Sequence, residues 1–199
     1  MYKKQMKFQK IVCLLVLAAS VVVFLYSLGI MTDLYDALYT TIGAPDKPDN
    51  TRRNPVAGAF IYYDMQGFNK NFLHLGIALI LVSLLLYLTN THVRRKYYVS
   101  NIFAVLANLA AGLCVAFWAH VQITAFRAQF LQIDFEALKT FSEKRNTLYT
   151  ESTFWFDIHY YIFAFVILAD LLLIANMIWK FRLMKEEKQL IEAGKEAAA

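Results

Sequence analysis

Four long apolar stretches constrain this chain more than any other feature. They cover residues 11–30, 72–91, 100–123 and 158–179, and Asp170 is the only Asp, Glu, Lys or Arg within them. A helix rises about 1.5 Å per residue, so about 20 residues cross the ~30 Å hydrocarbon core of a bilayer. Backbone polar groups in hydrocarbon must be hydrogen-bonded within their own segment. The sequence therefore predicts an all-α integral membrane fold with four spanning helices.

The first stretch also has features of a secretory signal. Basic residues precede it, and small residues frame the tripeptide Ser27-Leu28-Gly29. Its apolar run is longer than the ~7–15 residues of a signal core, which favours a retained span. Cleavage would leave three spans with the same sidedness of the loops.

The distribution of Lys and Arg predicts which side each loop occupies. There are four before the first span, three in the short loop after the second span, and five from residue 180 onward. The loops 31–71 and 124–157 carry four each, beside five acidic residues each. Because short Lys/Arg-rich flanks stay in the cytoplasm, both termini are predicted inside and both long loops outside. We expect an antiparallel four-helix bundle, one domain over residues 1–199, with a cytoplasmic tail at 180–199.

Helical spacing continues into the second outer loop. Five apolar residues there recur at steps of three or four, namely Phe126, Phe130, Ile133, Ala137 and Phe141. Such spacing predicts one apolar face of a helix. The third span either extends outward as a long helix or turns to lie along the surface, so the outer loops would form a partly helical cap.

Cysteine use and glycosylation signals bear on location. Cys13 and Cys114 both fall within predicted spans, and no Asn-x-Ser/Thr sequon occurs. Outer loops without disulfides or glycans suit a bacterial plasma membrane better than a eukaryotic cell surface. The net charge of +5 is explained by the Lys and Arg residues in the flanks predicted to be cytoplasmic. It does not indicate a nucleic-acid partner.

Two polar residues are predicted at similar depth inside the membrane. Asp170 lies near the middle of the fourth span and Asn108 near the middle of the third. A charged carboxylate at the bilayer centre costs at least ~2.5–3.5 kcal/mol, so Asp170 should face protein or water. Three interpretations remain open: a hydrogen bond between Asp170 and Asn108 that joins the two spans, contact with a partner subunit, or a proton or cation relay.

Small residues mark one surface of the third span. Ala104, Asn108, Gly112 and Ala116 follow one another at four-residue steps. Small side chains allow close approach of helices in lipid, where apolar burial gives no driving force. We expect Ala104, Gly112 and Ala116 to pack against other helices of the bundle, or against a partner.

Three histidines are predicted at the same outer depth on three helices. His74 lies at the start of the second span, His120 near the end of the third and His159 at the start of the fourth. Imidazoles could bind a metal ion or the iron of a b-type haem. Alternatively, they are amphipathic rings at the headgroup level that point away from one another.

No motif of a known catalytic type occurs in the sequence. The glycines form no phosphate-binding loop. We expect the isolated serines Ser20, Ser27 and Ser83 to donate hydrogen bonds to the preceding helical turn. The sequence thus favours a non-enzymatic accessory or structural subunit of a larger membrane complex, of transporter or respiratory type. Its expected contacts are lipid, other membrane subunits and an extracytoplasmic protein at the outer loops. The alternatives are a haem- or metal-binding redox subunit and a small proton-coupled carrier centred on Asp170.

Overall fold

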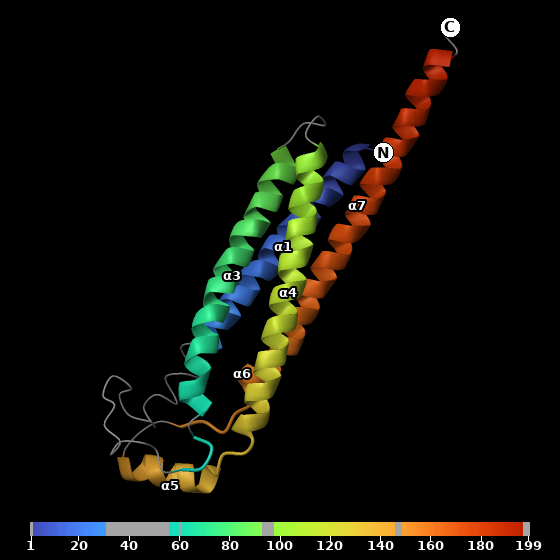
Figure 1. Cartoon of the computed structure of the whole chain (residues 1–199). Helices are drawn as coiled ribbons and strands as arrows, with labels where there is room; N and C mark the ends of the chain where they lie inside the picture. Colours follow the sequence, from blue (N-terminus) through green and yellow to red (C-terminus); the bar gives the residue numbers. More distant parts are fainter. Residues whose placement is uncertain (1, 31–55, 60, 93–97, 146–148, 197–199) are drawn as a thin grey trace. The chain divides into compact units, whose positions relative to one another are not determined.

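The protein is almost entirely helical where its structure is described. The computed structural model describes residues 2–30, 56–59, 61–92, 98–145 and 149–196. Of these residues 91% are helical and none forms a strand. The helices are α1 (Tyr2–Gly29), α3 (Ile61–His92), α4 (Tyr98–Phe130), α5 (Phe135–Arg145), α6 (Phe154–Asp157) and α7 (His159–Glu196), labelled in Figure 1.

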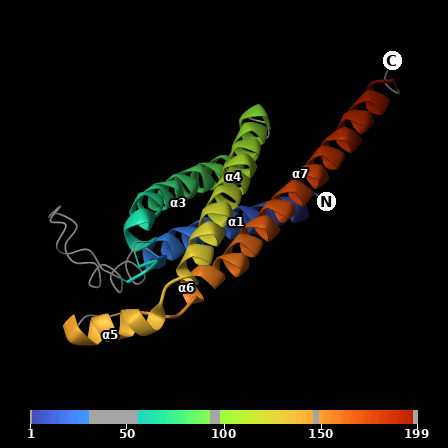
Figure 2. The ribbon, with the colours of Figure 1, turned by 60° about the horizontal axis from the view of Figure 1, so that its bottom comes forward.

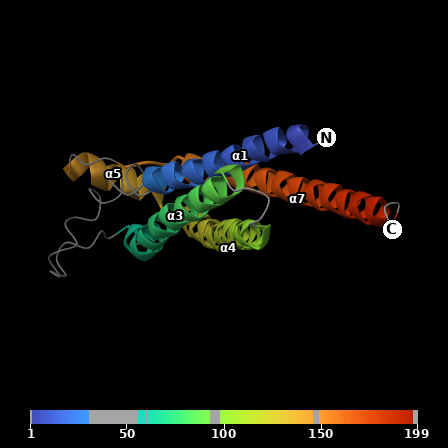
Figure 3. The same ribbon diagram turned by 90° about the horizontal axis from the view of Figure 1, so that it is seen from above.

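Four of these helices, α1, α3, α4 and α7, are long and apolar enough to cross a membrane. They coincide with the four predicted spans, and their course can be followed in Figure 2 and Figure 3. Each helix is longer than its apolar stretch, because the backbone hydrogen-bond ladder continues into polar sequence at one or both ends. Most of the first predicted outer loop, at 31–55, and the basic turn at 93–97 lie outside the described residues.

The second predicted outer loop contains a helix of its own. α4 ends at Phe130, and α5 follows after a four-residue turn, running crosswise to the last turns of α4 (Figure 1). Asp134 caps α5, since its carboxylate accepts a hydrogen bond from the backbone N–H of Ala137 at 3.0 Å. Gly58 packs against this turn with φ of +79°, and a Cβ there would lie 3.2 Å from Cα of Ile133. Both its backbone angle and the close contact favour glycine.

The chain divides into two compact units, and each long helix contributes a segment to both. The first unit comprises Met1–Ser20, Leu79–Leu113 and Ala164–Ala199, and the second comprises Val21–Ala78 and Cys114–Phe163. The first unit is joined by buried polar side chains. A hydrogen-bonded amide cluster connects α1, α3 and α7, and a second set of hydrogen bonds connects α1, α3 and α4.

The core of the second unit is aromatic. Phe68 of α3 is its centre, with ring centroids 5.5 Å from Phe72, 5.3 Å from Trp118 and 5.5 Å from Phe126. Tyr26 of α1 makes edge-to-face contact with Phe72 at 5.7 Å. Aromatic pairs in these geometries add to the stabilisation from burial alone. This core joins α1, α3 and α4 near His74 of α3 and His120 of α4.

Candidate functional site

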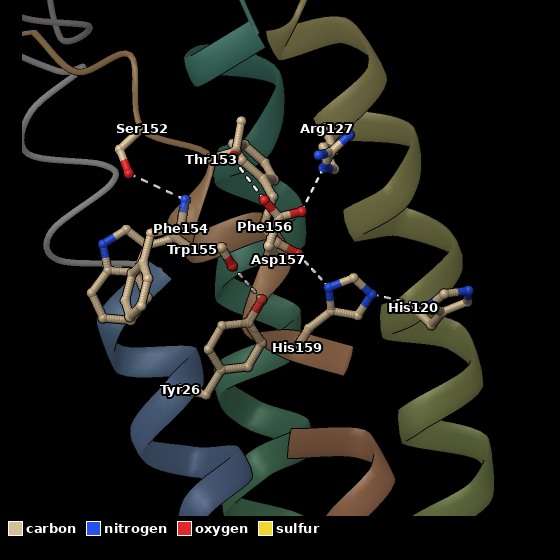
Figure 4. Close-up of polar contacts among 10 residues, drawn as sticks. All are labelled: Tyr26, His120, Arg127, Ser152, Thr153, Phe154, Trp155, Phe156, Asp157 and His159. Atoms are coloured by element: carbon tan, nitrogen blue, oxygen red, sulfur yellow. Dashed lines mark hydrogen bonds and ion pairs between the residues drawn. The ribbon is translucent and has the colours of Figure 1, made fainter. Parts of the chain in front are cut away.

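Two of the three predicted histidines contact each other directly. His120 of α4 and His159 at the start of α7 lie with Nδ1 of His120 3.0 Å from Nε2 of His159 (Figure 4). His159 is completely buried, and His120 is partly exposed. The pairing brings together two elements that are far apart in the sequence.

The second ring nitrogen of His159 sets the direction of this hydrogen bond. Nδ1 of His159 contacts the backbone carbonyl of Phe156, which can only accept a hydrogen. Nδ1 of a neutral His159 must therefore carry the proton, which leaves Nε2 as an acceptor. His120 then donates from Nδ1, and its own Nε2 keeps the lone pair. A proton on His159 has no onward path through the Phe156 carbonyl, so the pair is poorly suited to relay protons.

The third histidine does not join this pair. His74 of α3 is exposed, and no group of three or more His, Cys, Asp or Glu side chains in the described parts of the chain could hold a metal ion. A metal would also compete with the hydrogen bond for the lone pair of His159. The described structure thus brings His120 and His159 together and leaves His74 apart from them.

An ion pair lies next to the histidines and was not predicted from the sequence. Arg127 of α4 donates from Nε to Oδ1 of Asp157 at 2.7 Å, and Thr153 donates to Oδ2 at 2.6 Å (Figure 4). Tyr26 of α1 donates to the backbone carbonyl of Trp155 at 2.7 Å. These bonds hold the α6 segment, which carries the carbonyl that orients His159. A sequence signal exists in hindsight, because Arg127 lies seven residues beyond His120 and so on nearly the same face of α4.

The predicted intramembrane polar residues are both buried but have different surroundings. Asn108 donates from Nδ2 to Oγ of Ser83 at 3.0 Å, and the Oγ atoms of Ser83 and Ser20 are 2.6 Å apart. Oδ2 of Asp170 has no hydrogen-bond partner. The structure thus joins Asn108 to α3, and the predicted bond between Asn108 and Asp170 is not among the hydrogen bonds of these residues.

The small-residue surface of α4 is buried along its length. Ala104, Asn108, Gly112 and Ala116 are all buried. Gly112 makes the closest approach, since a Cβ built on it would lie 2.9 Å from Oδ2 of Asp170. The lack of a side chain at Gly112 thus allows α4 and α7 to approach closely, as expected for a small residue in a membrane helix.

Serine and amide side chains make contacts that hydropathy alone does not predict. Ser20 and Ser27 donate to carbonyls of their own helix, as expected. The unexpected contacts are those of a buried amide cluster. Gln5 donates to Gln9 and to Asn176, both at 3.0 Å, and Gln9 donates to the Asn90 carbonyl at 2.6 Å. Gln5 and Gln9 are four residues apart and so lie on one face of α1. This spacing is the sequence signal that could have predicted the cluster.

The described polar side chains mainly join one helix to another through hydrogen bonds. Most of the bonds named here join side chains of different long helices, or a side chain to the α6 segment. They can orient neighbouring helices, but none places a nucleophile beside a general base. Comparison of this chain with protein-family models, with curated proteins and with solved structures found no match.

Proposed function

We propose that this protein is a non-enzymatic accessory subunit of a larger membrane complex. In this proposal the four long helices form an antiparallel bundle in a bacterial plasma membrane, with both termini in the cytoplasm. The helix α5 and its neighbouring segments form an outer cap. The partner is another integral membrane subunit, which we expect to contact the cytoplasmic end of α7.

The length of α7 supports this proposal. α7 has 38 residues and so extends about 57 Å. Only its first part is apolar, because the predicted span ends at Trp179. The remaining helical residues, 180–196, project about 25 Å beyond the hydrocarbon core.

The projecting part of α7 has an apolar face in an otherwise charged helix. Leu183, Met184, Leu190 and Ile191 recur at helical spacing, and Leu190 and Ile191 are 74% and 54% exposed. A helix in water with large exposed apolar residues on one face is typical of a helix that binds another helix. This exposed face is the observation that carries the proposal.

Charge along this face favours a different protein over a second copy of the same chain. Lys180 and Glu187 lie seven residues apart along the middle of the apolar face. In a parallel pair of identical helices each would meet its own copy, and like charges that meet directly oppose association. We therefore propose an amphipathic helix of another membrane subunit as the occupant.

Two adjacent substitutions test this proposal. Leu190→Glu adds one negative charge to the apolar face, and Gln189→Glu adds the same charge to the opposite, polar face. The protein is purified in mild detergent from membranes of cells that produce it naturally, and the mass of the assembly is measured by native mass spectrometry. We expect a stoichiometric heteromeric assembly with the unaltered protein and with Gln189→Glu, and its loss with Leu190→Glu. A monomeric unaltered protein, or an assembly that survives Leu190→Glu, would refute the proposal.

A second candidate function is binding of a metal ion or b-type haem at the histidine pair. The observation that favours it is Nε2 of His120, which keeps its lone pair while Nδ1 donates to His159. A visible absorption spectrum and elemental analysis of the purified protein test this candidate. A colourless preparation without bound metal would exclude it.

A further inference from the structure

The carboxyl of Asp170 has an enclosed seat between two helices of the first unit. Its side chain is on α7 and is only 4% exposed. Oδ2 faces Gly112 of α4, where an added Cβ would lie 2.9 Å from Oδ2 and 3.5 Å from Cγ1 of Val166. The absence of a side chain on Gly112 therefore leaves the space that the carboxyl oxygen occupies.

Among the described residues of this unit, no basic side chain lies close to Asp170 along the helices. Residues 102–113 of α4 include no ionisable side chain, and on α7 the nearest cation is Lys180, about three helical turns away. On α1 the nearest ionisable groups are Cys13 and Lys10, and on α3 it is Tyr87. Cys13 is itself buried.

The neighbouring polar groups also offer the carboxylate no hydrogen bond. Asn108 lies one turn from Gly112 on the same face of α4, but its amide nitrogen donates to Ser83. Oδ2 of Asp170 is buried without a partner. A buried carboxylate without a cation or donor is strongly disfavoured in hydrocarbon, whereas a neutral carboxylic acid is tolerated much better.

We infer that Asp170 is a proton-binding site, seated against Gly112, that holds the neutral carboxylic acid at pH values where exposed carboxyls are ionised. The ligand is a proton taken from water, and no other atom is transferred. Loss of this proton leaves a carboxylate that needs water or a cation. Because Oδ2 is buried against Gly112 without a partner, we expect release of the proton to favour local separation of α4 and α7. Protonation of Asp170 and closure of this contact are therefore coupled.

Infrared spectroscopy of the protein in a detergent without ester or carboxyl groups tests this inference. The carbonyl stretch of a protonated carboxyl is separate from that of a carboxylate, and at pH 6 exposed Asp and Glu are almost fully ionised. We expect a protonated-carboxyl band in the unaltered protein at pH 6 that is lost on alkaline titration. The band should be absent in Asp170→Asn and unchanged in Asp157→Asn, whose carboxyl is part-exposed and paired with Arg127.

A second variant tests the seat itself. In Gly112→Ala the new methyl group would displace Oδ2, so the band should shift in frequency or disappear at pH 6. Circular dichroism checks that each variant is folded. Absence of the band from the unaltered protein at pH 6 overturns the inference without reference to any variant. Persistence of the band in folded Asp170→Asn overturns it as well.

Discussion

Ser83 of α3 is the point at which removal of a single oxygen atom should most clearly weaken the first unit. Ser20 of α1 donates to the carbonyl of Val16, so in the Ser20–Ser83 contact Ser83 must be the donor. Ser83 in turn accepts from Asn108 of α4. Ser83→Ala would thus remove two bonds between different helices while changing the side-chain volume little.

The expected magnitude follows from the number of bonds and from what each partner can do afterwards. Hydrogen bonds between membrane helices contribute about 0.6 kcal/mol on average and up to ~1.7 kcal/mol. Two lost bonds predict that Ser83→Ala lowers the free energy of unfolding by about 1–3 kcal/mol. Ser20→Ala should cost about 0.5–1 kcal/mol, because the freed Ser83 hydroxyl can rotate toward its own helix.

Unfolding by a denaturing detergent, followed by circular dichroism, measures these differences. The double variant Ser20→Ala, Ser83→Ala should cost about as much as Ser83→Ala alone, because Ser20 has already lost its interhelical partner. Ser27→Ala is the control, since Ser27 donates to the Phe24 carbonyl within α1. Strictly additive costs, or a Ser83→Ala variant as stable as the Ser27→Ala control, would refute the proposed chain of hydrogen bonds.

Two further predictions concern the second unit and use matched pairs of variants. Gly76→Ala should lower the unfolding free energy by about 1–3 kcal/mol, because its Cβ would lie 3.2 Å from Cα of Phe24. Gly67 lies in the same helix with open space around it, so Gly67→Ala should be neutral or stabilising by about 0.5–1 kcal/mol. Equal effects in the same unfolding assay would contradict the close α1–α3 contact. His159→Phe should cost about 1–2 kcal/mol through loss of its two buried hydrogen bonds, and His74→Phe should change stability by less than ~0.5 kcal/mol. A larger effect at His74 would argue against the pairing described.

The sequence predicted the helices better than their ends. Hydropathy marked the four long apolar helices, because burial in hydrocarbon requires a long uncharged run. It placed the start of the second span at residue 72, whereas α3 begins at Ile61, since polar residues such as Asp64 and Lys70 continue the helix beyond the apolar part. The helical spacing after the third span was also informative, although the chain turns after Phe130 before α5 begins.

Depth along the helices was a partial guide to the candidate site. Counting from the predicted span ends placed His120 and His159 at one level, and the structure brings them into contact. The same count placed His74 level with these two histidines, but His74 does not contact them. It also placed Asn108 level with Asp170, but Asn108 donates its hydrogen bond to Ser83 instead. Position along a helix is fixed by residue number, whereas the direction of a side chain around the helix depends on how that helix packs.

The sequence by itself determined how many long apolar helices there are and that they suit a lipid environment. Transfer of apolar side chains into lipid and bonding of the backbone within a helix are local effects that add up residue by residue. The tertiary structure alone decided that Asn108 binds Ser83, that His159 accepts from His120, and that Asp170 lies against Gly112. These contacts depend on the rotation of each helix about its axis. That rotation is set by the packing of several helices at once, and no local stretch of sequence contains it.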